Sequence, residues 1–301
     1  MSWLTKTART GACIAAVALA GCSGGVLDPH GPIADAERKI LFDALAIMLA
    51  LIIPTVIGGI WVGWWFRDGN RARTRYRPEF TFSGRIEILI WSVPTLIIVF
   101  LGGLIWYGSH QLDPYRPLDS AEKSVEVQVV ALDWKWLFIY PEQGIGSINA
   151  LVIPEGTPVH LQITASSVMN TFWVPQLAGM IYAMNGMVTQ LNLAADHPGE
   201  FAGRSGDFSG DNFSDMHFTV RAVSKDAYAQ WLAQAKADGP ALDRAAYEKL
   251  KAQSVIDRPM TYRTVDPALF DAIATQQIAP GPGPTLAGKA GLDVHPTSAE
   301  K

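Results

Sequence analysis

Cysteine is scarce in this sequence: its 301 residues include only two, Cys13 and Cys22. Because both lie within the first 22 residues, the rest of the chain offers no thiolate for a disulfide or a soft-metal site. Charged residues are also few (17%), whereas 49% of residues are hydrophobic. This composition excludes a disordered chain, and the net charge of −4 gives no basic field for nucleic acid. The apolar residues gather in two blocks, near 40–66 and 86–108, so we predict a membrane protein with a soluble part.

The N-terminus has the pattern of a bacterial export signal. Lys6 and Arg9 precede an apolar run, residues 11–20, that is too short to span a bilayer. The sequence Leu19-Ala20-Gly21-Cys22 follows and resembles a lipoprotein signal, in which the cysteine is acylated after cleavage. We therefore predict a signal peptide at 1–21 and lipidation of Cys22, which would leave the mature chain without a free thiol. The alternative is an ordinary cleavage site beside an incidental cysteine.

Two charge-free stretches predict a transmembrane hairpin at 41–110. Residues 44–66 and 88–109 contain no charged side chain, and we place the spans at about 41–66 and 86–108. The loop between them, 67–85, has six arginines against one aspartate and one glutamate. The positive-inside rule places this loop in the cytoplasm, so both ends of the mature chain lie outside. A basic loop can also bind anionic lipid or nucleic acid, but beside a span it usually sets orientation.

The rest of the chain changes from period-2 to helical patterning. Val125, Val127 and Val129 alternate with polar residues, and further short apolar runs follow at turn-bounded intervals up to residue 223. We predict a β-sandwich at 123–223 after an exported segment at 22–40. A helical C-terminal region follows at 224–278, with helices at about 224–237, 240–252 and 267–273, and a disordered tail at 279–301.

Four segments resemble subunit II of the haem–copper respiratory oxidases: Glu87–Pro94, Asp133–Trp136, Val168–Pro175 and Ser205–Met216. The first is similar to the family's opening of the second span. The second matches an aromatic run on an early strand, and the last two match the segments that carry copper ligands. The resemblance implies a membrane α plus all-β fold: a two-helix transmembrane hairpin, a cupredoxin-like β-sandwich, and a short helical C-terminal region.

The copper-loop positions depart from the family pattern. In relatives that take electrons from cytochrome c, a dinuclear copper centre uses two bridging thiolates, two imidazoles, a methionine thioether and a backbone carbonyl. Here Asn170 stands at the first histidine, Ser205 and Ser209 at the cysteines, Asp207 at the carbonyl donor, Phe213 at the second histidine, and Met216 alone is retained. Hydroxyls do not replace thiolates toward soft copper, so we predict no metal at this site.

This loss is typical of the quinol-oxidising branch, and the segments Tyr140–Gly144, Ser167–Asn170 and Ile181–Met184 look like the cytochrome bo-type ubiquinol oxidases. The resemblance implies subunit II of a proton-pumping terminal quinol oxidase, which oxidises ubiquinol and reduces oxygen to water. The chain would belong to an enzyme but hold no redox centre and no cofactor, because haems, copper and ubiquinol would bind subunit I.

The same resemblance implies the partners and the location. Subunit I, smaller membrane subunits and the lipid bilayer are expected partners, and nucleic acid and cytochrome c are not. The chain would be a multi-pass lipoprotein of the bacterial inner membrane with its C-terminal domain in the periplasm. The alternative is a stand-alone, membrane-tethered cupredoxin-like binding protein, although a mere tether has no need of the polar motif Glu87–Pro94.

Glu87 is the candidate for chemistry. A carboxylate at the start of a span is costly unless it is hydrated or paired, and the family's glutamate at this position lies at the mouth of a proton channel into subunit I. The alternative is a headgroup-level carboxylate that favours the positive end of the helix, with Arg85 as a partner.

The remaining tryptophans, histidines and methionines of the exported domain are interpreted as structural residues. Trp134 and Trp136 are expected to pack the sandwich or face a partner subunit. The histidines 160, 197 and 217 have no ligand-like spacing. Packing also accounts better than a Cu(I) site for the methionines 169, 180, 184, 187 and 216.

Overall fold

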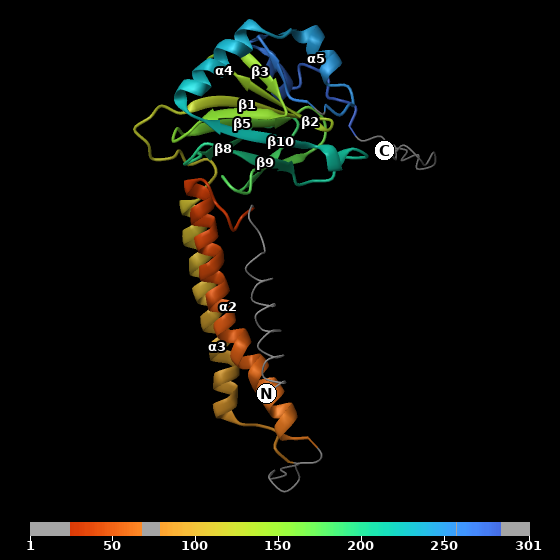
Figure 1. Cartoon of the computed structure of the whole chain (residues 1–301). Coiled ribbons are helices and arrows are strands. Elements are labelled where there is room, and N and C mark those ends of the chain that lie inside the picture. The colour runs from red at the N-terminus through yellow and green to blue at the C-terminus, as the bar shows by residue number, and fades with distance from the viewer. Residues whose placement is uncertain (1–24, 68–78, 257, 284–301) are drawn as a thin grey trace, which may run out of the picture. The chain divides into compact units, whose positions relative to one another are not determined.

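The computed structural model of the chain describes residues 25–67, 79–256 and 258–283 (Figure 1). The chain has two compact units: a helical unit, Asp35–Asp113, and a second unit formed by the described residues from Pro114 onward together with residues 25–34. Cys22, most of the basic loop and the end of the predicted tail lie outside the described residues.

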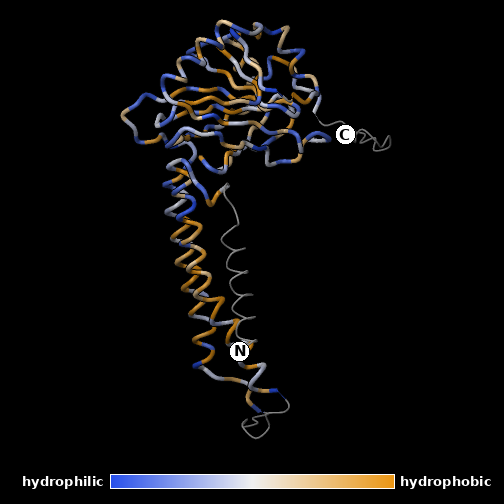
Figure 2. The backbone as a smooth tube through the Cα atoms, in the orientation of Figure 1, coloured by the Kyte–Doolittle hydropathy of each residue, from blue (hydrophilic) through white to orange (hydrophobic). Residues whose placement is uncertain are grey.

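The helical unit consists of α2 (Pro32–Trp65) and α3 (Gly84–Gln111). At 1.5 Å per residue they are about 50 and 40 Å long, and both are long and apolar enough to cross a membrane. The backbone tube of both helices is mostly orange, the colour of hydrophobic residues, in Figure 2. Most of their apolar side chains are exposed within this chain. Such a surface needs lipid or other helices around it. α2 begins ahead of the predicted span, because its first turns carry the charged stretch that ends at Asp43.

The two helices pack in antiparallel register. A Cβ at Gly108 would lie 2.7 Å from Cδ1 of Ile40, so a larger residue there would require the Ile40 side chain to move. Farther along, Ala50–Thr55 of α2 and Leu89–Pro94 of α3 line one hollow of about 490 Å³. These two points fix which residues of the hairpin lie at the same level.

The second unit is a β-sandwich with one sheet of six strands and one of five. The six-stranded sheet has the order β12-β3-β2-β1-β5-β8: β12 (Met260–Tyr262), β3 (Ile145–Ile148), β2 (Lys135–Tyr140), β1 (Val125–Leu132), β5 (Val159–Ala165) and β8 (Thr189–Leu193). The five-stranded sheet has the order β4-β10-β9-β6-β7: β4 (Ala150–Pro154), β10 (His217–Val223), β9 (Gly199–Ser205), β6 (Asn170–Trp173) and β7 (Met180–Ala183).

An aromatic core fills the space between the sheets. Trp136 and Phe138 of β2 meet Phe172 of β6 and Phe218 of β10, with the rings of Phe172 and Phe218 stacked at 4.8 Å between centroids. Only glycine fits at position 203 of β9, because a Cβ there would lie 2.1 Å from the Phe218 ring. This core packs against β6, β9 and β10, the strands that carry or flank the copper-loop positions.

A second core covers the outer face of the six-stranded sheet. Side chains of α5 (Arg244–Leu250) and α6 (Leu269–Ala274) pack on β1 and β2, where Leu132 and Leu137 point outward. β1 and β2 are therefore buried on both faces, unlike the half-exposed strands that a period-2 pattern describes. A small sheet of β11 (Ala241–Leu242) with β13 (Thr264–Val265) adds Leu242 and Val265 to this second core. The helix α4 (Lys225–Ala237) packs instead against the aromatic core, through Trp231, Leu232 and Ala235.

The predicted fold class is confirmed: two apolar helices precede a β-sandwich of the expected kind and short C-terminal helices. Ser224 caps α4 as predicted, accepting a bond from the amide of Ala227 at 3.3 Å. The second C-terminal helix begins later than predicted, at Arg244, because residues 241–242 pair with β13 and Asp243 supplies the cap. Strands β3, β6, β7 and β9 were not predicted, and neither were β11, β12 and β13, which lie in the region predicted to be helical.

Candidate functional site

The six copper-loop positions lie at one end of the five-stranded sheet. Asn170 begins β6 and Ser205 ends β9; Asp207, Ser209 and Phe213 follow in the loop to β10, and Met216 immediately precedes that strand. A short 3-10 helix, η2 (Phe213–Asp215), shapes the end of the loop. The structure thus brings the six positions into one region of the sandwich.

The hydroxyls at the two cysteine positions are engaged in bonds within the protein. Ser209 is buried and its Oγ lies 3.8 Å from Sδ of Met216, at sulfur hydrogen-bond distance. The Oγ of Ser205 accepts a bond from Nε1 of Trp136 at 3.2 Å. Ser209 is therefore a small polar part of the core, and Ser205 lies at its edge, bonded to a core tryptophan.

The other positions do not converge on a metal-binding arrangement. Asn170 is buried, and its Oδ1 has no hydrogen-bond partner among the described residues. The carboxylate of Asp207 accepts a short hydrogen bond from Oγ1 of Thr171. Phe213 packs edge-on against Phe208, with ring centroids 5.8 Å apart.

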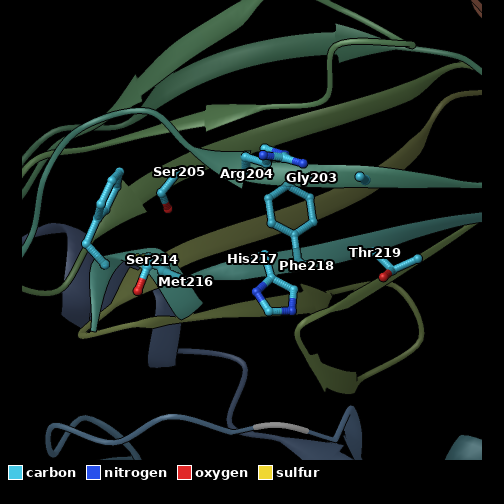
Figure 3. A pocket seen from close by; sticks show the side chains of 10 residues that line it. Gly203, Arg204, Ser205, Ser214, Met216, His217, Phe218 and Thr219 are labelled. Atoms are coloured by element: carbon cyan, nitrogen blue, oxygen red, sulfur yellow. The ribbon is translucent and has the colours of Figure 1, made fainter. Parts of the chain in front are cut away.

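A hollow of about 430 Å³ opens beside these residues (Figure 3). Ser205, Phe213 and Met216 line it together with residues of β9 and β10, among them Arg204 and His217. Figure 3 shows the Phe218 ring between the two strands.

The donor set does not fit a dinuclear copper centre. Hydroxyl, amide and phenyl groups stand at the positions of thiolates and imidazoles, and the thioether of Met216 is the one soft donor retained among the six. Within the described residues, no three side chains of histidine, cysteine, aspartate or glutamate lie close enough to hold a metal ion.

The tryptophans of the segment Asp133–Trp136 pack inside the sandwich. Trp136 is fully buried against Phe172 and Phe218. Trp134 lies in the turn between β1 and β2 with a φ of 64°, is 7% exposed, and donates from Nε1 to the carbonyl of Ser209 at 3.1 Å. Both tryptophans hold the degenerate loop in place.

Lys135 is a buried charged residue whose role the sequence did not indicate. It is 0% exposed, and its Nζ donates to the carbonyl of Ala252 at 2.7 Å and to Oγ and the carbonyl of Ser254 at 2.7 and 3.2 Å. Burial lowers the pKa of Lys135 to about 8, partly opposed by the charge of Asp133. The lysine thus joins the sandwich to the C-terminal region across 117 residues of chain.

Glu87 lies in the first turn of α3 and is half-buried. Nε1 of Trp91 donates to its Oε2 at 3.2 Å, and none of the described ion pairs joins it to Arg85. Gly108 is level with Ile40, and residues 89–94 are level with residues 50–55. In an antiparallel pair these two points place Glu87 level with residues 57–61 of α2, four to eight residues before that helix ends at Trp65. The charge-free run of α2 continues to Phe66. Glu87 is therefore level with the last turns of the apolar part of α2.

Comparisons with known proteins agree with this architecture. Residues 97–223 match the family described as cytochrome c oxidase subunit II, periplasmic domain, and residues 236–281 match the COX aromatic rich motif. The chain is 44% identical over 276 residues to ubiquinol oxidase subunit 2 of Acetobacter aceti, covering 91% of this chain and 89% of that one. It is 43% identical over 255 residues to cytochrome bo(3) ubiquinol oxidase subunit 2 of Pseudomonas putida, covering 85% and 81%.

Among solved structures, the chain is similar to the periplasmic domain of subunit II of cytochrome oxidase of Bradyrhizobium japonicum. The identity is 22%, the TM-score is 0.37, and the match covers 39% of this chain and 98% of that one.

Proposed function

The chain belongs to the ubiquinol oxidase subunit 2 family, and from this membership we propose that it is the second subunit of a proton-pumping terminal oxidase of an aerobic respiratory chain. The complex oxidises ubiquinol and reduces oxygen to water. Subunit I and smaller membrane subunits are its partners, and subunit I holds the haems, the copper and the quinol. The chain itself carries no electrons.

The chemistry of the copper-loop side chains carries this proposal. A subunit that passed electrons from cytochrome c would need thiolates and imidazoles at this loop, and this chain offers serine, asparagine and phenylalanine instead. The bonds of Ser205 to Trp136 and of Ser209 to Met216 support a structural use of the same positions. Electrons from quinol then reach subunit I without passing through this domain.

For Glu87 we propose a role in proton entry. A carboxylate level with the apolar part of α2 is expensive in lipid unless a water-filled path or a partner subunit reaches it, and such acids often belong to proton paths. The lack of an ion pair to Arg85 among the described residues weighs against the headgroup alternative. Glu87 takes up protons on the cytoplasmic side, where the basic loop is proposed to lie.

We also propose that Cys22 is the lipidated N-terminus of the mature chain, which is anchored in the inner membrane with its sandwich in the periplasm. The segment Leu19–Cys22 supports this, and so does the agreement between lipidation outside and an arginine-rich loop inside. Mass spectrometry of the N-terminal peptide tests the proposal. A diacylglyceryl mass on Cys22 is expected, and an unmodified Cys22 thiol in the mature chain would contradict it.

Purification of the tagged full-length chain in a mild detergent tests the assignment to an oxidase, with a preparation from untagged cells as the control. A multi-subunit complex with haem absorption bands is the expected result. A colourless eluate containing this chain alone would contradict it and would favour the stand-alone binding protein.

A further inference from the structure

Trp91 makes a hydrogen bond to Glu87, the residue proposed for proton entry. Its indole Nε1 donates to Oε2 of Glu87 at 3.2 Å, one turn along α3. In an apolar environment an indole N–H needs an acceptor, and a carboxylate needs a donor or water. Each of these side chains therefore satisfies the other.

The position of Trp91 on the helix is not explained by packing against α2. Its side chain is 71% exposed within the chain, whereas the half-buried residues Val93 and Ile97 face α2. Trp106, on the same helix, is exposed to the same degree (70%), and its indole makes no hydrogen bond among the described residues. Trp91 is thus distinguished from Trp106 by its bond to Glu87.

The bond from Trp91 makes the two carboxylate oxygens of Glu87 inequivalent. A glutamate side chain has three rotatable bonds, and a donor at Oε2 selects one orientation among them. Oε2 is held by the indole, and Oε1 has no partner among the described residues. Oε1 is therefore the oxygen available for a further hydrogen bond.

Resting on the proposed role of Glu87 in proton entry, we propose that Trp91 is a positioning residue, which fixes the Glu87 carboxylate by its indole N–H so that Oε1 receives the proton. Trp91 itself takes no proton. Phenylalanine at this position keeps an aromatic ring in the helix surface but removes the donor.

The test compares Trp91→Phe, Glu87→Gln, the double variant and Trp106→Phe in the purified oxidase complex, with the haem spectrum and subunit composition confirming assembly. Turnover is measured as quinol-driven oxygen uptake in ordinary and in heavy water. Trp91→Phe is expected to slow turnover roughly three- to tenfold, as the loss of one ordinary intramolecular hydrogen bond implies, and to increase the solvent isotope effect. Trp106→Phe is expected to change neither.

The double variant separates positioning from structure. If Trp91 acts through Glu87, adding Trp91→Phe to Glu87→Gln slows turnover no further. Normal turnover in Trp91→Phe beside slow turnover in Glu87→Gln would overturn this inference alone, and so would additive losses in the double variant. Normal turnover in Glu87→Gln would overturn the proton-entry proposal, and this inference with it.

Discussion

Nε1 of Trp134 lies 3.1 Å from the backbone carbonyl of Ser209 and donates a hydrogen bond to it, although 75 residues separate them. The bond ties the turn between β1 and β2 to the loop that carries the degenerate copper positions. Trp134 adopts a φ of 64°, which is rare for a bulky residue and persists where the surroundings hold it. An aromatic residue next to the former copper loop is therefore part of the architecture of that loop.

Replacing Trp134 by phenylalanine should destabilise this end of the sandwich. The buried carbonyl of Ser209 loses its donor, at a cost of about 1–3 kcal/mol. Chemical unfolding of the purified full-length chain, followed by tryptophan fluorescence, measures the loss. Trp173→Phe is the matched control, since the Trp173 indole makes no hydrogen bond among the described residues, and equal losses in both variants would refute the argument.

The lowered pKa of Lys135 should make the free energy of unfolding increase with pH. Its pKa is lowered from 10.5 to about 8 by burial, so between these values the unfolded chain binds more protons than the folded one. The free energy of unfolding therefore rises with pH across this window, by about 3 kcal/mol from this group. Below pH 8 the penalty for burying the charge is fully present.

The measurement is the difference in unfolding free energy between the wild-type chain and Lys135→Met, at pH values from 7 to 10.5. Taking the difference removes the titration of the other lysines and tyrosines. The wild type should gain relative to the variant as the pH rises through 8 to 10. A difference that stays constant over the whole window would show that Lys135 is not buried in its charged form.

The copper loop should regain a metal when its donors are restored. The variant Asn170→His/Ser205→Cys/Ser209→Cys/Phe213→His supplies two imidazoles and two thiolates beside the retained Met216. We expect copper to bind with thiolate-to-copper absorption in the visible range, measured by elemental analysis and spectroscopy. Asn170→His/Phe213→His without the cysteines is the control and should give no such band. Failure of the full variant to bind copper while folded would show that the loop geometry has also diverged.

Glu87→Gln should slow quinol-driven oxygen uptake without preventing assembly, because glutamine keeps the size and polarity of the side chain but cannot exchange a proton. A loss of about tenfold or more is expected for a group on an obligatory proton path. Glu79→Gln, an exposed carboxylate preceding the same helix, is the control and should retain full activity. Unchanged turnover in an assembled Glu87→Gln complex would return Glu87 to an ordinary helix-end carboxylate.

The sequence predicted those parts of the fold that depend on local pattern. The charge-free runs that end at Phe66 and Ser109 marked the two helices, and the alternation of Val125, Val127 and Val129 marked β1. β9, with the sequence GEFAGRS, has two glycines and three charged or polar side chains, so it becomes a strand only through pairing with β10 and β6.

The features that the sequence did not predict depend on contacts between residues far apart in the chain. The burial of Lys135 depends on Ala252 and Ser254, which lie more than a hundred residues away in sequence. The six copper-loop positions were found from the motif alone, but their bonds to Trp134 and Trp136 required the structure. The pairing of Glu87 with Trp91 follows helical spacing, and a search at four-residue intervals would have detected it.

The central claim is that this chain serves an oxidase that takes electrons from quinol and not through a copper site of its own. Oxygen uptake by the complex purified through the tagged chain tests it most directly, with a short-chain ubiquinol and reduced cytochrome c supplied as donors in parallel. The account predicts rapid uptake with ubiquinol and none above background with cytochrome c. Uptake driven by cytochrome c at a comparable rate would contradict it.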